Sequence, residues 1–261
     1  MKILKFTLKG KTGFFKKPDV NTYLYFTYGN IHRVALLGMF GAVLGLSGYN
    51  AMKLKESLKN KDKKNKIENK SEYPEFYEKL KDLKVAVTPN AERGCISKKV
   101  QVFNNSVGYA SKEQGGNLIV KEQWLENPSW DIYVAIEDEI SEKLAEYILS
   151  NKAVYQPYLG KNDHYADIMN AQLIDAAEAD DVNRIHCLFK KDDFNIIFED
   201  EEDEDDEVMD DLFKYEERLP AALNRDTNMY ESCTFVFTNM KVRSKGGCTI
   251  YKADDKNIVF S

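Results

Sequence analysis

The sequence is poor in the residues that build metal centres and disulfide frameworks. Its 261 residues include four cysteines and three histidines. Cys95, Cys187, Cys233 and Cys248 form no C-x-x-C pair, and none has a histidine at metal-ligand spacing. We therefore expect reduced thiols, no metal site and no cofactor. The chain opens with the strand-like MKILKFTLKG instead of a signal peptide, which predicts a cytoplasmic protein.

Long hydrophobic runs are also missing. The apolar stretch VALLGMFGAVLGL covers 34–46, which is 13 residues, whereas a membrane-spanning helix needs about 20. We therefore predict a buried helix and no membrane contact. Its glycines at 38, 41 and 45 fall on one helical face, and each costs about 1 kcal/mol relative to alanine. Such a face predicts a very close neighbour, such as a sheet lying beneath the helix.

No catalytic signature is present: the sequence has no Walker loop, no H-E-x-x-H and no G-x-S-x-G. The charge pattern is more informative. The chain has a net charge of −6, but residues 199–211 alone hold eleven acids, and without them the net charge would be +5. Residues 1–84 carry 18 basic and 8 acidic side chains. A basic N-terminal third suits a polyanionic partner, and the acidic run, which we expect to be a surface loop, excludes RNA at its own position.

The periodicity of apolar residues predicts alternating strands and helices. Strands are expected at 2–9, 21–30, 84–90, 129–136 and 166–176, and helices at 31–46, 73–82 and 139–151. The Lys-rich segment 53–72 is expected to be a solvated helix end that runs into a loop. Two exposed strands around Gly115-Gly116 predict a long hairpin at about 95–125. Further strands are expected from residue 181 onward, within DVNRIHCLFK, FNIIFE, CTFVFTNMKV, GGCTIYK and KNIVF.

This order predicts an α+β fold. The strand–helix–strand–hairpin–strand–helix–strand order over 1–176 is that of ferredoxin-like or RRM-like domains. We expect the hairpin to protrude as a thumb. Residues 177–261 are expected to form a β-rich C-terminal extension that includes the acidic loop.

Four stretches carry a resemblance to a known family: IHRVALLGMFGAVLGLSGY, NPSWDIYVAI, YLGK at 158–161, and ERLPAALNRDTNMYESCTFVFTNMKV. In this order they resemble the fifth Cas protein family, and the last two resemble its type I-B members. These proteins are Cascade subunits that hold the 5′ handle of the CRISPR guide RNA. The resemblance departs from the family pattern at Ile31-His32, where many relatives have prolines, and in the segments 53–72 and 199–211.

The resemblance implies a non-catalytic RNA-binding protein that caps the guide and nucleates assembly of the antiviral complex. The implied partners are the 5′ handle and the backbone and large subunits of Cascade, with target DNA met indirectly. The residues expected to bind RNA are Lys9, Lys11, Phe14, Lys16, Lys17, His32, Arg33, Lys98, Lys99, Lys121 and Lys161. Arg33 is the foremost candidate, because a guanidinium at a helix start can pair bidentately with a phosphate.

Alternatives remain open. Phe14 and Phe15 could stack on bases or pack beneath their loop. Trp124 is expected in the core at the hairpin base, and His164 in a surface loop. One branch of the family cleaves guide precursors without metal, using Tyr, Lys and His. Here His32 with Tyr28 is the nearest counterpart, so a metal-independent endoribonuclease is the alternative function. A scaffold that contacts only protein is a third possibility.

Overall fold

The computed structural model describes residues 1–261 except 20–22, 63–72, 107, 109–111, 181 and 198–210. The helices are α1 (Arg33–Leu44), α2 (Tyr49–Asp62), α3 (Glu75–Leu80) and α4 (Glu139–Leu149). The strands are β1 (Lys2–Lys9), β2 (Thr12–Gly13), β3 (Val85–Pro89), β4 (Lys98–Asn104), β5 (Ile119–Glu126), β6 (Ser129–Ala135), β7 (Asp167–Glu178), β8 (Phe189–Lys190), β9 (Phe194–Ile196), β10 (Lys214–Leu223), β11 (Tyr230–Thr238), β12 (Val242–Ser244), β13 (Ile250–Ala253) and β14 (Lys256–Val259).

A six-stranded antiparallel sheet forms the centre of the molecule, in the order β14-β13-β7-β1-β6-β3. The protein is therefore a strand-rich α+β fold, as expected. β1 lies inside this sheet between β6 and β7, and buries side chains on both faces: Ile3 and Leu4 are both fully buried. Within KILKFTLK, Ile3 is the apolar residue that departs from the alternation, and it packs in the second hydrophobic core, on the face opposite Leu4.

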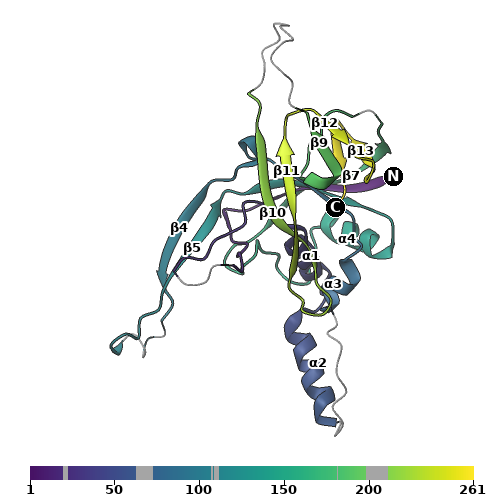
Figure 1. Cartoon of the computed structure of the whole chain (residues 1–261). Helices are drawn as coiled ribbons and strands as arrows, with labels where there is room; N and C mark the ends of the chain where they lie inside the picture. The colour runs from purple at the N-terminus through teal and green to yellow at the C-terminus, as the bar shows by residue number, and fades with distance from the viewer. Residues whose placement is uncertain (20–22, 63–72, 107, 109–111, 181, 198–210) are drawn as a thin grey trace.

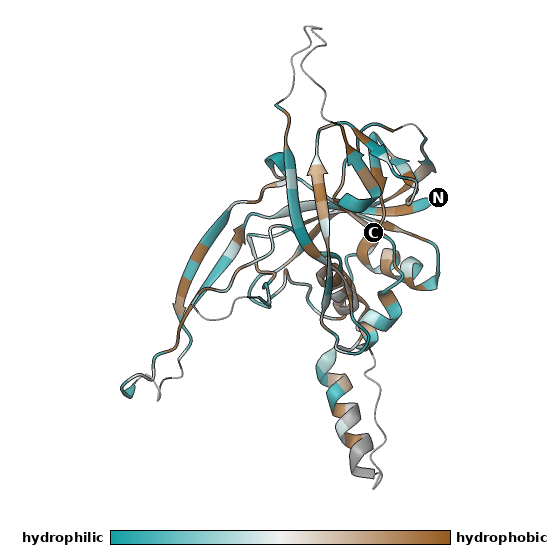
Figure 2. Cartoon of the chain, in the orientation of Figure 1, coloured by the Kyte–Doolittle hydropathy of each residue, from teal (hydrophilic) through white to brown (hydrophobic). Residues whose placement is uncertain are grey.

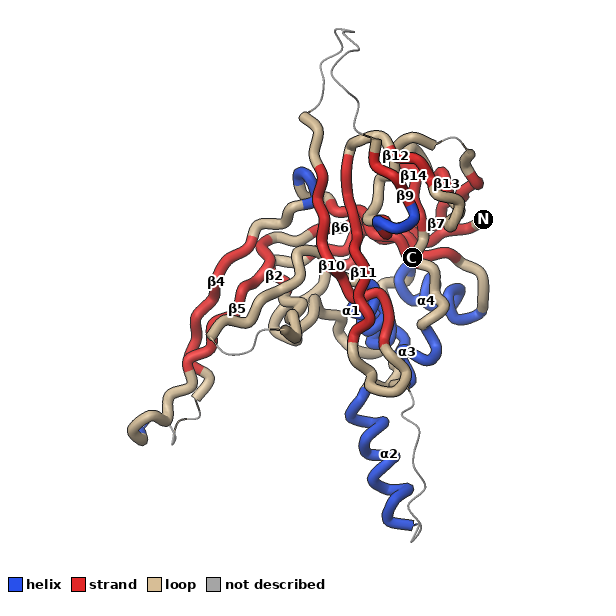
Figure 3. The backbone as a smooth tube through the Cα atoms, in the orientation of Figure 1, coloured by secondary structure: helices blue, strands red, loops and turns tan. Residues whose placement is uncertain are grey.

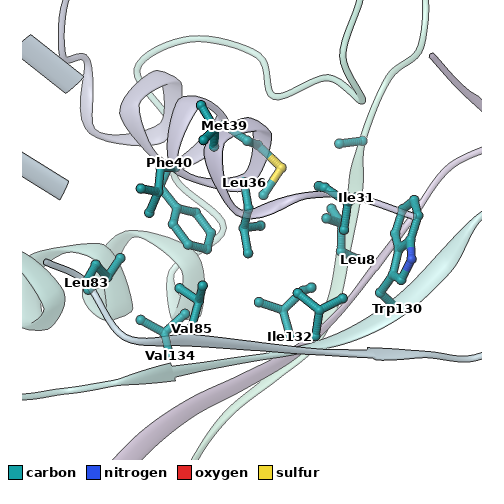
Figure 4. Packing of buried hydrophobic residues seen from close by; sticks show 14 of the residues in the cluster. Leu8, Ile31, Leu36, Met39, Phe40, Leu83, Val85, Trp130, Ile132 and Val134 are labelled. Atoms are coloured by element: carbon teal, nitrogen blue, oxygen red, sulfur yellow. The ribbon is translucent and has the colours of Figure 1, made fainter. Parts of the chain in front are cut away.

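One face of the sheet packs against α1 and α4. Leu8, Ile132 and Val134 meet Leu36 and Phe40 of α1 in the main core (Figure 4). The opposite face carries a second, smaller core, in which Ile3 and Tyr133 pack against residues of the C-terminal part such as Cys187 and Phe189. The sheet is thus enclosed by helices on one face and partly by C-terminal strands on the other (Figure 3).

The glycine face of α1 meets a helix, which corrects the expectation of a sheet. A Cβ on Gly41 would lie 2.6 Å from the Cβ of Phe76 in α3, a distance that real side chains do not adopt. Gly45 ends α1 in a left-handed conformation, with φ of 76°. The close approach of α3 therefore explains Gly41, and the helix cap explains Gly45.

Two elements project from the body. The hairpin of β4 and β5 extends to one side, and α2 extends away from α3 (Figure 1). The hairpin predicted at 95–125 is confirmed, and it carries hydrophobic stretches although it projects (Figure 2). In α2, Leu54 and Leu58 are 62% and 55% exposed. Both projections leave apolar side chains without cover from the described part of the chain.

Other expectations were wrong or lie outside the described residues. Segment 23–30 forms no strand, because its main chain makes only isolated bridges at Tyr25 and Thr27. Within DVNRIHCLFK, the described residues 182–190 contain a strand only at Phe189–Lys190. Residues 63–72 and 198–210, which cover half of the Lys-rich segment and nearly all of the acidic run, fall outside the description. Among the described residues, no helix is both long and apolar enough to cross a bilayer.

Candidate nucleic-acid interface

The base of the projecting hairpin is bound by the basic loop, residues 9–19, which begins at the last residue of β1. Thr12 and Gly13 pair with Glu126 and Leu125 of β5. Tyr25 then adds two main-chain bonds, donating to the oxygen of Lys121 at 2.9 Å and accepting from the amide of Gln123 at 2.8 Å. The basic loop and the hairpin therefore form one continuous surface.

A buried carboxylate holds the inner face of the hairpin. Glu122 is 5% exposed. It accepts a hydrogen bond from Trp124 Nε1 at 2.8 Å, and it forms an ion pair with Lys161 Nζ at 3.2 Å. Lys161 also lies over the ring of Phe103 in β4. Trp124 thus lies half-buried at the hairpin base, close to the expected place, and Lys161 has a structural partner.

His164 lies directly beneath this group. It is 1% exposed, which corrects its expected place in a surface loop. Its Nδ1 lies 2.6 Å from Thr12 Oγ1, and its ring meets the edge of Trp124 at 4.6 Å between centroids. Burial lowers the pKa of the ring, so the neutral imidazole serves as a packing element between β2 and β5.

We expect Glu122→Ala to lower the free energy of unfolding by about 1–3 kcal/mol, because it leaves the indole N–H without its charged acceptor. The contribution of Lys161 is smaller, since its side chain is 33% exposed and solvent screens it. Glu126→Ala is the matched control, because its 3.5 Å ion pair with Lys99 joins two exposed side chains. Urea unfolding measures both variants, and equal losses would contradict the anchoring role of Glu122.

The outer face of the hairpin is open. Cross-strand pairing places Lys98, Val100 and Val102 of β4 on the same face as Lys121 and Ile119 of β5. Val100, Val102 and Ile119 are 50–54% exposed. This face combines lysines with uncovered aliphatic groups, which suits contact with another macromolecule. Lys99 points to the other face, where it pairs with Glu126.

The lysines of the basic loop differ in their freedom. Lys9, Lys11 and Lys16 are exposed. Lys16 covers the ring of Tyr25 at 4.2 Å, and Lys17 is paired with Glu217 at 3.0 Å. Lys9 and Lys11 are therefore the freest cations of this loop.

Phe14 and Phe15 point inward. They are 5% and 3% exposed, and Phe15 meets the edges of Trp130 and His32. Of the two alternatives, packing beneath the loop is the one that the structure shows. Phe14 is accordingly not placed to stack on a base.

Arg33 is half-buried and bound to main-chain oxygens, which argues against its expected phosphate contact. Its guanidinium donates to the main-chain oxygens of Ser261 at 2.9 Å, Leu83 at 3.0 Å and Lys81 at 2.5 Å, with a longer bond to Ala221. Burial lowers its pKa. These carbonyl oxygens occupy the guanidinium N–H groups that a phosphate would need. Arg33 therefore connects distant chain segments and does not offer a free cation to RNA.

His32 is likewise internal. It is 3% exposed and caps α1, accepting at Nδ1 from the amide of Ala35 at 3.2 Å. Burial lowers its pKa to about 3. The structure brings Tyr28 against its ring, with centroids 5.1 Å apart. A buried imidazole of such low pKa is a poor base for a ribose hydroxyl, and it is not placed to contact RNA.

A hollow that the sequence did not reveal opens beside these residues. It has a volume of about 740 Å³, and its lining includes Lys17, Tyr28, Tyr49, Arg218, Met229 and Tyr230. Three segments far apart in the sequence form it, so no local motif signals it. Tyr158 and Tyr165, which lie opposite each other in an isolated bridge, are a further exposed aromatic pair, at 44% and 67%.

Solved structures of other proteins have folds similar to that of this chain. No family model and no curated protein matches the sequence. A CRISPR protein from Archaeoglobus fulgidus is 10% identical, with 100% of this chain and 99% of that one covered and a TM-score of 0.50. A chain of a CRISPR RNA-guided surveillance complex is 10% identical, with 98% and 91% covered and a TM-score of 0.48. A further Cas protein is 10% identical, with 93% and 95% covered and a TM-score of 0.40. The likeness to the Archaeoglobus protein extends over the whole chain and concerns the fold.

Proposed function

We propose that this protein is the non-catalytic subunit of a CRISPR RNA-guided complex that binds and caps the 5′ handle of the guide RNA. The observation that carries the proposal is the whole-chain fold likeness to a CRISPR protein. We also infer an RRM-like body, and the order β7-β1-β6-β3 with α1 and α4 on one face supports that inference. The role further includes nucleating assembly with backbone and large subunits in the cytoplasm, and target DNA is met only through them.

The hairpin side is the better place for the RNA. An RRM binds RNA on its open sheet face, but here that face is partly covered by Ile185, Cys187 and Phe189. The hairpin instead presents Lys98 and Lys121 beside the exposed Lys9 and Lys11 of the neighbouring loop. Phosphates that run along this surface would meet cations and uncovered apolar groups together.

The test is to express the tagged protein with the products of its neighbouring genes and to sequence the RNA that co-purifies. We expect one RNA class with a single defined 5′ end. Protein assembly without RNA would favour the protein-only scaffold. The isolated subunit should also leave labelled guide precursor intact in EDTA, because His32 is buried and its pKa is low. Specific cleavage in that assay would establish the ribonuclease alternative.

A further inference from the structure

The hollow beside Tyr230 combines flat apolar surfaces with a cation. Its walls come from residues 17–19 and 28, from Tyr49, the first residue of α2, and from residues 218, 228–230 and 232 of the β10–β11 hairpin. Tyr49 and Tyr230 are 37% and 42% exposed, and Met229 is 67% exposed. Exposed rings and a thioether gathered around one hollow form a surface for stacking a planar group.

The aromatic side chains of the wall pack against one another and are uncharged. The His32 ring lies between Tyr28 and Tyr230, edge to face with each, at 5.1 and 5.3 Å between centroids. Burial raises the pKa of Tyr28 to about 12 and also raises that of Tyr230. Both hydroxyls therefore remain protonated near neutral pH and can donate hydrogen bonds.

Two cations line the hollow, and only one of them is available. Lys17 is held by Glu217, whose carboxylate also accepts from the amide of Gly29 and from Tyr215 Oη. Arg218 is exposed and has no carboxylate partner within the described part of the chain. A guanidinium of this kind suits a phosphate. Asp19 at the rim can accept from a base amino group or a ribose hydroxyl.

We infer that this hollow binds one unstacked nucleotide of a single-stranded RNA, with its base against Tyr230, Met229 and Tyr49 and its phosphate on Arg218. The inference deepens the proposed function and rests on it only for the identity of the RNA strand. Recognition by stacking accepts any base, because every base has a flat face.

The experiment uses the full chain and a fluorescein-labelled ten-nucleotide oligo(A) RNA, titrated by fluorescence anisotropy. Tyr230→Ala should weaken binding roughly 5- to 100-fold, from the cost of losing one stacked base. Tyr230→Phe should retain most of the affinity, since it keeps the ring. Tyr155→Ala is the matched control: this tyrosine is 60% exposed but lies outside the hollow.

Arg218→Ala should weaken binding and reduce the slope of log K against log salt by about one phosphate contact. Arg243→Ala removes an exposed arginine elsewhere and should leave that slope unchanged. A ten-nucleotide RNA made entirely of abasic residues should lose its sensitivity to Tyr230→Ala while keeping its sensitivity to Arg218→Ala. Thermal melts verify that each variant is folded.

The inference is overturned if Tyr230→Ala binds oligo(A) like Tyr155→Ala, or if the abasic RNA responds equally to Tyr230→Ala. Failure of the proposed function is distinguishable. If oligo(A) binding depends on the hollow but no guide RNA co-purifies, the proposed function is contradicted and the nucleotide site is supported. If guide RNA co-purifies equally with wild type and Tyr230→Ala, the nucleotide site is contradicted and the proposed function is supported.

Discussion

Arg33→Ala should lower the free energy of unfolding by about 3 kcal/mol or more, a larger effect than we expect from any exposed charge of this chain. The guanidinium donates to carbonyl oxygens at the end of α3, in the α3–β3 connection and at Ser261. Hydrogen bonds to a charged group contribute about 1.5–3 kcal/mol each, and unpaired carbonyls add to the loss. Partial exposure of the site reduces the total below the simple sum.

Arg33→Lys should recover little of that stability, because one ammonium cannot reach carbonyls that the planar guanidinium meets along separate directions. Arg93→Ala is the control, since Arg93 is exposed and pairs with the exposed Asp211 at 3.1 Å. That pair should contribute less than about 1 kcal/mol.

Thermal melts measure all three variants. At about 2–4 °C per kcal/mol for a chain of this size, Arg33→Ala should melt roughly 6–12 °C below wild type. Where Arg33→Ala remains folded, its affinity for handle RNA should equal that of wild type. A normal melt combined with weakened RNA binding would indicate that Arg33 contacts a phosphate, and would contradict its structural role.

Truncating the hairpin should reduce the guide RNA that co-purifies by more than about tenfold and leave the fold intact. The variant joins Gln101 to Glu122 through Asn-Gly in place of residues 102–121. Gln101 and Glu122 face each other in register, and Asn-Gly closes a two-residue hairpin well. The contacts of Glu122 with Trp124 and Lys161 are kept, whereas the ring of Phe103, which lies against Trp124 and Lys161, is removed.

The physical reason is that the removed strands carry surface that the described chain does not cover. Val102, Leu118 and Ile119 are at least 50% exposed, so their removal costs little core. The same change removes Lys121, one of the cations expected at the RNA. The melting temperature should therefore stay close to that of wild type while guide binding falls.

A shorter truncation that replaces only 106–117 with Asn-Gly is the graded control. It keeps both strands and the main-chain bond between Asn105 and Leu118, so we expect a smaller loss of guide RNA. The quantity to measure is guide RNA per mole of purified protein. Full guide occupancy in the long truncation would show that the hairpin is not part of the RNA-binding surface.

Local pattern determined the main elements of this protein. Alternation predicted β1 and the β4–β5 hairpin, and the apolar Gly-rich run predicted α1, because strand and helix periods are properties of neighbouring residues. The α+β class followed from the order of these elements. The strand predicted at 21–30 is wrong for its described residues, 23–30: the aromatic residues suit a strand, but Thr27 and Tyr28 are buried as part of a loop.

Tertiary structure alone decided what the polar and aromatic residues do. The sequence predicts Arg33 to be an exposed cation, whereas in the structure its guanidinium is bonded to carbonyl oxygens 48 to 228 residues away. The sequence places Phe14, Phe15 and His164 in loops. In the structure these loops fold beneath the base of the hairpin and bury the three side chains. The hollow at Tyr230 exists only because α2, the loop at 17–19 and the β10–β11 hairpin meet. Burial and the assembly of a site depend on contacts between distant segments, and sequence spacing carries no direct record of those contacts.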